Sequence, residues 1–274
     1  MNLSLIFNNF FLQLFYFVLL IGVVGYVISL LNRAFYKLIG DSRTACYATG
    51  FLGTPIHELS HAVMCLVFFH RIEEMRLFRI GDDGVLGYVN HSYNPRNVYQ
   101  RIGNYFIGVA PILCGGAVLF FVMPYLAPSL YLLFDGYVED FAYLQLQGFG
   151  LSEFLAYALV VMQGMLAALL TFQADGIGLW IFYILALCIA LHMNLSGADI
   201  KGALPALVPL VPALLIVNLA LGILAPATYD LFGAIVHMLG GYLTGMLLIA
   251  LVFSVVALLV AALIRVGMTL LRRR

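Results

Sequence analysis

The sequence predicts an all-α polytopic membrane protein with about six transmembrane helices and a small β-hairpin insertion. Hydrophobic residues make up 64% of the 274 residues, charged residues make up 9%, and the mean hydropathy is +1.05. Soluble domains do not have this composition. The apolar residues also fall into segments of about 20 residues, the length that a helix needs to cross a bilayer. We therefore expect a multi-pass integral protein of the cell membrane, surrounded by the lipid bilayer.

The first expected helix covers the apolar residues 3–31, which contain no Lys or Arg. This segment is too long and wrongly flanked for a cleaved signal peptide. Five further crossings are expected at residues 44–69, 103–126, 176–194, 204–224 and 240–264. The apolar segment 152–173 is either a seventh crossing or a re-entrant or interfacial helix, because only Gln173-Ala174-Asp175 separates it from the next crossing.

The basic residues favour six crossings over seven, since Lys and Arg are enriched on the cytoplasmic side of membrane proteins. With six crossings and a cytoplasmic amino end, ten of the 13 Lys and Arg residues are cytoplasmic. With seven crossings and an external amino end, the count falls to eight. The ten residues are Arg71, Arg76, Arg79, Arg96, Arg101, Lys201, Arg265, Arg272, Arg273 and Arg274.

The polar residues 70–101 are expected to form a β-hairpin after the second crossing. Met75–Ile80 and Val85–Tyr93 have the composition of short strands, and the Asp-Gly pair in the connecting residues 81–84 is typical of a tight turn. Such a hairpin can offer an edge strand to an extended peptide. No separate soluble domain is expected, so residues 1–274 are interpreted as a single transmembrane domain.

The clearest chemistry lies in His57-Glu58-Leu59-Ser60-His61, inside the second expected crossing. An ionisable side chain near the middle of a bilayer costs about 2.5–3.5 kcal/mol, so three together indicate a function. On a helix, His57 and His61 lie one turn apart on one face and can bind the same metal ion with Glu58 beside it. The alternative is a polar patch that only joins helices through hydrogen bonds. We interpret the motif as a zinc (Zn²⁺) hydrolase site with Glu58 as the general base.

The third zinc ligand must come from another segment, because a catalytic zinc ion usually has three protein ligands and one position for water. Ser196 and Asp199 follow His192 at spacings of four and seven, and the three residues would share a face of one continuous helix. We prefer Asp199, since a carboxylate completes a known ligand set. His192 and Asp175 are the alternatives. Taken alone, Asp199 would be an ordinary aspartate at a helix end.

The remaining cysteines and histidines are expected to be structural. All four cysteines lie inside apolar segments and none has CxxC spacing, so they are interpreted as buried thiols, neither disulfides nor zinc ligands. They are Cys46, Cys65, Cys114 and Cys188. Three further histidines are expected at the interface or in loops; they are His70, His91 and His237. No nucleic-acid partner is expected, because the only basic run is Arg272-Arg273-Arg274.

These features resemble the site-2 protease family of intramembrane zinc metalloproteases. The resemblance covers about residues 44–202 and rests on the His57–His61 motif, the hairpin-like segment after it, the run Gly-Asn-Tyr-Phe-Ile-Gly-Val-Ala-Pro at 103–111, and an aspartate two crossings later. It implies His57, His61 and Asp199 as zinc ligands and Glu58 as the catalytic base. It also implies a hairpin that guides an unwound substrate segment toward the metal.

One feature departs from the family pattern. The family's third-ligand aspartate is commonly followed by glycine, whereas Asp199 is followed by Ile200 and Asp175 is followed by Gly176. The resemblance therefore implies an intramembrane protease that acts on a transmembrane or signal-peptide-like protein, with the third ligand open. Two other functions fit the same residues, namely a catalytically idle metal-binding scaffold and a metal transporter.

Overall fold

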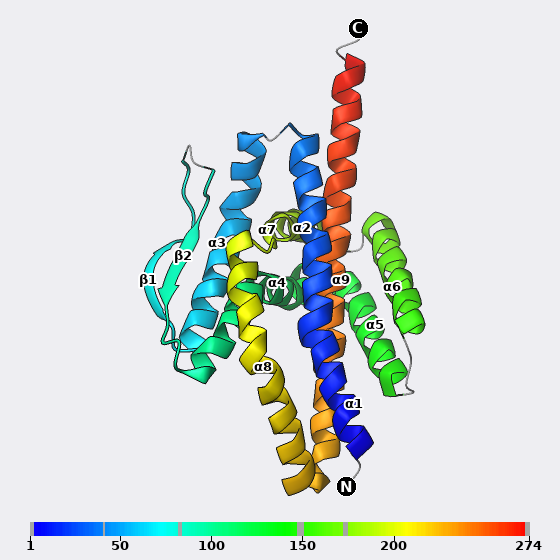
Figure 1. The fold of residues 1–274 in the computed structure, drawn as a ribbon. Helices are drawn as coiled ribbons and strands as arrows, with labels where there is room; N and C mark the ends of the chain where they lie inside the picture. The colour runs from blue at the N-terminus through cyan, green and yellow to red at the C-terminus, as the bar shows by residue number, and fades with distance from the viewer. Residues whose placement is uncertain (1–2, 41, 82–83, 147–150, 172–174, 272–274) are drawn as a thin grey trace.

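The chain is mostly helical and carries one small antiparallel sheet. The helices α1 to α2, α3 and α9 run along the long axis of the molecule, with the hairpin on one side and α5 and α6 on the opposite side (Figure 1). The computed structural model describes these parts of the chain: residues 3–40, 42–81, 84–146, 151–171 and 175–271.

Four helices of the described residues are long and apolar enough to cross a membrane, which supports a multi-pass membrane protein. They are Leu3–Leu38, Val98–Leu126, Gly197–Leu224 and Pro226–Leu271. The two other predicted crossings form helices α3 (Arg43–Val67) and α7 (Ile177–His192). Neither belongs to the four: α3 contains the polar His57–His61 motif, and the 16 residues of α7 extend only about 24 Å. The count of six crossings therefore stays a prediction.

The first helix is longer than residues 3–31 and contains a π-helical turn. It runs through α1 (Leu3–Leu14), η1 (Phe15–Leu20) and α2 (Ile21–Leu38). In the π-helical turn, the carbonyl of Phe17 accepts a hydrogen bond from the Tyr105 hydroxyl of α4 (Val98–Leu126). Such turns shift the backbone bonding pattern of a helix and free carbonyls for other partners. The contact joins the first helix to α4, which supplies one wall of the site described below.

Helix α3 ends in a tight turn that leads directly into the hairpin. The N–H of Phe69 donates to the carbonyl of Leu66 at 3.2 Å, and the N–H of His70 donates to the carbonyl of Cys65 at 2.8 Å. These two bonds define a Schellman motif, whose left-handed position is usually glycine. Phe69 occupies that position with φ of 55°, at a cost of about 1–2 kcal/mol for an L-residue. The turn reverses the chain so that residues after His70 run back along α3.

The hairpin is confirmed, but its first strand lies earlier than predicted. β1 (Arg71–Arg76) pairs antiparallel with β2 (Tyr88–Ser92), and a bulge falls between Ile72 and Glu74. The prediction of Met75–Ile80 was wrong because β1 is polar on both faces and has no alternation to reveal it. Beyond β1, residues 77–80 are not in a strand, although the N–H of Arg79 still donates to the carbonyl of Leu86 at 2.7 Å and the ring of Phe78 packs on Phe51 of α3. Of the predicted turn, Asp82 and Asp83 lie outside the described residues.

The chain breaks where a continuous helix was expected to carry three polar side chains. Helix α7 ends at His192, and α8 (Gly197–Leu224) begins after the N-cap residue Ser196. The reason is a capping box, in which Ser196 and Asp199 satisfy each other's backbone N–H groups. The prediction that His192, Ser196 and Asp199 share one helical face was therefore wrong. Asp199 instead lies in the first turn of α8, which also begins earlier than the predicted residue 204.

Two short helices pack beside the long carboxyl-terminal helix. The first is α5 (Pro128–Leu146), which the sequence interpretation missed. The second is α6 (Leu151–Thr171), which corresponds to the predicted segment 152–173; residues 172 and 173 of that segment lie outside the described residues. Both contact α9 (Pro226–Leu271). The 46 residues of α9 extend about 69 Å, well beyond the predicted residues 240–264.

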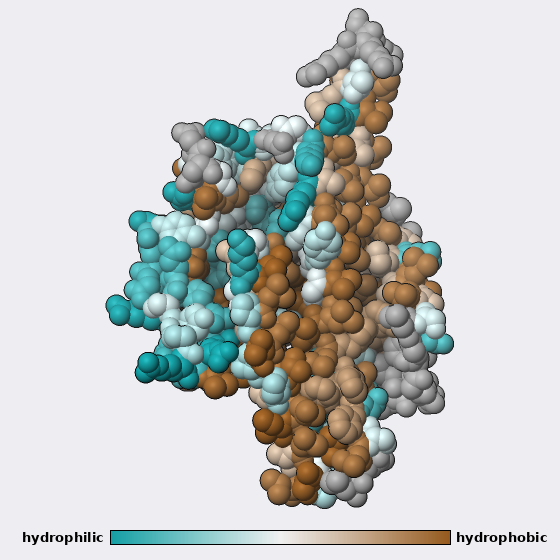
Figure 2. Space-filling model, viewed as in Figure 1, coloured by the Kyte–Doolittle hydropathy of each residue, from teal (hydrophilic) through white to brown (hydrophobic). Residues whose placement is uncertain are grey.

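Hydrophilic and hydrophobic residues occupy different parts of the surface. Figure 2 shows hydrophilic residues gathered over the hairpin and hydrophobic residues covering α8 and the neighbouring helices. The core between the long helices is filled by large side chains, among them Phe134, Phe182 and Phe253, which are at most 2% exposed. The metal-binding motif of α3 therefore lies between a polar hairpin on one side and an apolar helical body on the other.

Candidate metal centre

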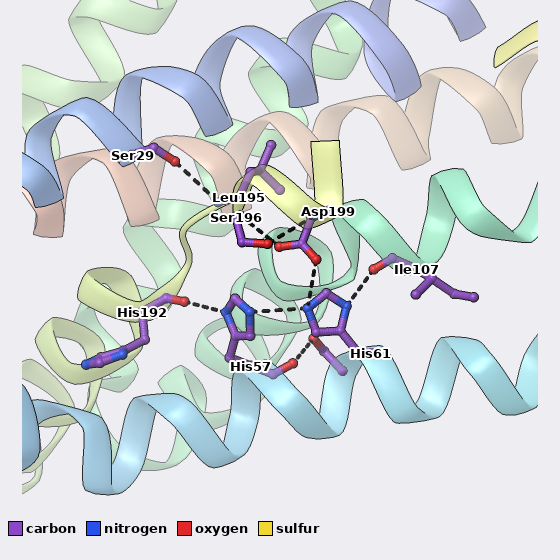
Figure 3. Close-up of polar contacts among 9 residues, drawn as sticks. Ser29, His57, His61, Ile107, His192, Leu195, Ser196 and Asp199 are labelled. Carbon is purple, nitrogen blue, oxygen red and sulfur yellow. Dashed lines mark hydrogen bonds and ion pairs between the residues drawn. The ribbon is translucent and has the colours of Figure 1, made fainter. Parts of the chain in front are cut away.

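The structure brings three ligand groups from two helices to one point. His57 and His61 lie one turn apart on α3, with their Nε2 atoms 3.2 Å apart. Asp199 of α8 places its Oδ1 atom 3.5 Å from the Nε2 atom of His61. The three ligand atoms all lie within 4.8 Å of one another, and the side chains converge in Figure 3. The motif and the preferred third residue are thus adjacent, although 138 residues separate His61 from Asp199.

Backbone carbonyls determine which ring nitrogens are free to bind a metal. The Nδ1 atom of His57 lies 2.7 Å from the carbonyl of His192, and that of His61 lies 2.7 Å from the carbonyl of Ile107. A carbonyl only accepts, so each Nδ1 donates its proton. In the neutral imidazoles, both Nε2 atoms then carry lone pairs. Such bonds from Nδ1 to a carbonyl are the usual support of metal-binding histidines.

The two spacings that His61 makes with His57 and Asp199 fit a tetrahedral zinc ion. Ligands bound at 2.0–2.1 Å in a tetrahedron are about 3.3 Å apart, close to the 3.2 Å and 3.5 Å found here. Two nitrogen lone pairs and a carboxylate oxygen face one another, and none of them supplies a proton. Because these atoms repel one another, a cation among them stabilises the arrangement. His57, His61 and Asp199 are therefore the residues that would hold zinc.

The capping box orients the third ligand. The Oδ2 atom of Asp199 accepts the N–H of Ser196 at 2.8 Å, and the Oγ atom of Ser196 accepts the N–H of Asp199 at 3.0 Å. One carboxylate oxygen is thus occupied by the helix cap, and the other points to His61. The N–H of Leu195 donates to Ser29 of α2 at 3.2 Å, which ties the start of α8 to the first helix.

A glycine on α4 lets the start of α8 come this close. A Cβ atom at Gly108 would lie 2.7 Å from the carbonyl oxygen of Asp199 and 2.9 Å from the Cβ of Ala203. Such distances are too short for any side chain. The glycines of residues 103–116 thus serve close helix packing.

Glu58 lines the same cavity as the three ligand groups. The cavity has a volume of about 300 Å³, and its wall also includes Asn104 of α4 and the β2 residues Tyr88 to His91. Glu58 is only 7% exposed. The hairpin lies directly over it, since a Cβ atom at Gly87 would be 2.7 Å from its Cγ atom. A buried carboxylate beside a candidate metal centre is placed to exchange protons with water in the cavity.

The alternative third ligands lie elsewhere. The His192 ring contacts the hydroxyl groups of Thr49, Thr54 and Tyr36 at 3.1–3.3 Å and points away from the cluster (Figure 3). His192 still contributes to the centre through its carbonyl, which holds His57. Asp175 accepts hydrogen bonds from the backbone and hydroxyl of Ser129 at the start of α5.

Sequence analysis missed a second group of side chains that could hold a metal ion. Cys65, His70 and His91 were interpreted as a buried thiol and as loop histidines, but their ligand atoms lie within 4.8 Å of one another. Burial lowers the pKa of both His70 and His91 below the usual range, so both are neutral at pH 7. No signal in the sequence joins these residues, because their proximity depends on the turn after α3 and on the register of the hairpin.

No family model, curated protein or solved structure matches the chain. The function is therefore argued from the chemistry of the site.

Proposed function

We propose that the protein is an intramembrane zinc metalloprotease of the site-2 protease type. The observation that carries the proposal is the convergence of the ligand atoms of His57, His61 and Asp199 within 4.8 Å of one another, with Glu58 in the same cavity. Zinc, when bound there, supplies Lewis acidity, which polarises a peptide carbonyl and lowers the pKa of water. Three ionisable groups that converge between apolar helices favour a functional site over a purely structural one.

Glu58 acts as the general base and then as the general acid. Its carboxylate takes a proton from the attacking water and delivers it to the nitrogen of the departing amine. Asn104, buried in the wall of the cavity, carries an amide that can donate a hydrogen bond to the carbonyl oxygen of the substrate as negative charge develops there. The cavity is large enough for water, which the hydrolysis consumes.

The hairpin is the surface that receives the substrate. Residues Tyr88 to His91 of β2 line the cavity, and within the described residues β1 is the only strand that pairs with β2. The other edge of β2 can therefore take an extended peptide through main-chain hydrogen bonds. A transmembrane substrate must unwind to bind in this way, which exposes its peptide bonds to the centre.

A second, apolar cavity supports the proposal of a substrate that comes from the bilayer. It has a volume of about 270 Å³, lies between the first helix, α4 and α8, and shares Gly108 and Asp199 with the first cavity. Its other walls include Val18, Val109 and Leu207. An apolar space that opens next to the candidate ligand suits a transmembrane or signal-peptide-like segment better than a soluble peptide. The proposal includes six crossings, with α3 and α7 in the membrane and the hairpin on the cytoplasmic side.

The test separates metal binding from cleavage. Glu58→Gln keeps the shape of the side chain but cannot accept the proton, so bound zinc should be unchanged while cleavage of co-expressed single-span reporter proteins falls by about 10²–10⁴-fold. Glu139→Gln, an exposed glutamate on α5, is the matched control and should cleave normally. Wild-type cleavage by Glu58→Gln would refute the mechanism.

One observation favours a different function, that of a metal transporter. A transporter needs donors in succession along a path, and Cys65 of the second group lies one helical turn beyond His61 on α3. This function predicts zinc flux into vesicles that contain the purified protein, and flux that depends on both groups. A catalytically idle scaffold predicts neither flux nor any effect of Glu58→Gln.

A further inference from the structure

A second cluster of metal-binding side chains lies where helix α3 meets the hairpin. Cys65 comes from the last turn of α3, His70 follows the turn, and His91 lies in β2; their ligand atoms are within 4.8 Å of one another. We propose that this cluster binds a second zinc ion, which fastens the hairpin to the end of α3. The proposal does not depend on whether the protein cleaves peptides.

The turn after α3 brings the first two residues of the cluster together. In a Schellman motif the two residues joined by the outer hydrogen bond are frequently in side-chain contact as well. Here these residues are Cys65 and His70, whose carbonyl and N–H are 2.8 Å apart. The motif forms although Phe69, 75% exposed, occupies the left-handed position that normally takes glycine. The surroundings therefore impose this turn, and its result is to direct His70 toward Cys65.

The hairpin supplies the third residue. His91 pairs with Ile72 in the sheet, next to the bulge between Ile72 and Glu74, and bulges redirect side chains. The Nδ1 atoms of His91 and His70 are 3.0 Å apart. The Nε2 atom of His70 lies 2.8 Å from the carbonyl of Gln100 and donates its proton there. In the neutral ring, the Nδ1 atom of His70 therefore carries a lone pair that faces His91.

A thiolate with two imidazoles is a ligand set for a borderline-soft ion such as zinc. Cys65 and His70 are buried, at 0% and 4% exposure. His91 also lines the cavity of the first centre, so water from that cavity can fill the fourth position of a tetrahedral ion. The carbonyl bond to His70 is the same kind of support that His57 and His61 receive. Without an ion, the same atoms form a simple hydrogen bond between two histidines, and the experiment distinguishes the two states.

The second ion would control the wall of the first centre. β2 carries both His91 and the cavity-lining residues Tyr88 to Asn90. Fastening His91 to Cys65 holds this strand at a constant distance from α3, the helix that carries His57 and His61. Under the proposed function, loss of the second ion should raise the KM for a substrate more than it lowers kcat.

The experiment counts zinc in the purified full-length protein by mass spectrometry of the metal. Wild type should contain two zinc ions per chain, and both Cys65→Ser and His57→Ala should contain one. The double variant should contain none. Cys188→Ser, a buried cysteine on α7 outside the cluster, is the matched control and should keep two.

Cobalt spectroscopy tests the ligand set without altering it. With the other three cysteines replaced by serine, the cobalt-loaded protein should show a sulfur-to-cobalt charge-transfer band from Cys65. The band should persist in His57→Ala and disappear in His91→Ala. A single zinc ion per wild-type chain that His57→Ala loses, or a cobalt spectrum without this band, would overturn the proposal even if Cys65→Ser fails to fold. A failure of the proposed function differs from this outcome, because it would leave the Cys65 band intact while Glu58→Gln has no effect.

Discussion

Asp199 tests the metal centre most sharply, because the same carboxylate caps a helix and faces His61. Asp199→Ala removes both contacts. Ser196→Ala is the matched control: it removes one bond of the capping box but leaves the carboxylate and its bond from the N–H of residue 196. Each variant loses one cap hydrogen bond, worth about 1 kcal/mol. The metal-free proteins should therefore lose similar stability, and any larger difference must come from zinc.

The magnitude follows from linkage between binding and folding. At free zinc equal to 100 times Kd, the ion stabilises the wild type by about 2.7 kcal/mol. Loss of a supporting contact weakens metal binding by about 10–100-fold, so zinc should still stabilise Ser196→Ala by about 0.4–1.4 kcal/mol at the same concentration. Loss of the ligand itself should weaken binding further, which leaves Asp199→Ala with less than about 0.4 kcal/mol.

The assay is chemical or thermal unfolding in detergent with and without zinc, together with competition against a chromophoric zinc chelator. Asp175→Ala should behave as wild type, because Asp175 contacts Ser129 and not the centre. His192→Ala should resemble Ser196→Ala, since its ring positions the chain segment whose carbonyl holds His57. The assignment is refuted if Asp199→Ala binds zinc as tightly as wild type while Asp175→Ala or His192→Ala loses it. All of these variants are made in protein that also carries Cys65→Ser, so that zinc bound by the second cluster does not add to the measured stability or affinity.

Three further predictions concern the hairpin, the close packing at α8 and the topology. Gly87→Ala places a Cβ atom 2.7 Å from the Cγ atom of Glu58 and should reduce reporter cleavage without loss of zinc. Gly136→Ala, where a Cβ atom meets nothing within 4 Å, is the control. Equal cleavage by the two variants would contradict a role for the contact between Gly87 and Glu58. Gly108→Ala should push α8 away from α4, because the new Cβ atom lies 2.7 Å from the Asp199 carbonyl, so zinc affinity should fall; a wild-type chelator titration would refute this. In the six-crossing topology, single cysteines in residues 33–43 should react with an impermeant thiol reagent on intact cells and those in 70–101 should not; the reverse labelling would favour seven crossings.

The sequence alone predicts the helical membrane class, the hairpin after α3 and the pairing of His57 with His61. These features depend on local information. A long apolar segment has few stable states other than a membrane helix, and two residues four positions apart meet on any helix. Helix α5 was missed because Asp135, Glu139 and Asp140 interrupt its apolar pattern, although packing against α9 supports the helix.

The third ligand shows where local information ends. Composition and ligand preference favoured Asp199, yet the reason for its position was wrong, because the chain breaks between His192 and Ser196 and a capping box starts a new helix. The orientation of the carboxylate depends on that cap, and the free Nε2 atoms of His57 and His61 depend on carbonyls of His192 and Ile107. His192 lies 135 positions from His57, and Ile107 lies 46 positions from His61.

The cluster of Cys65, His70 and His91 depends on tertiary structure throughout. A left-handed turn at Phe69 and a bulge in the hairpin bring the three side chains together. Phenylalanine normally avoids the left-handed conformation, and no residue type marks the bulge, so neither feature can be inferred from the sequence. The sequence determined most of the apolar helices and which of the helices carries the His57–His61 motif, because hydrophobicity and helical periodicity act within each segment. Tertiary structure decided which distant groups complete each site, because contacts between segments depend on how the helices pack.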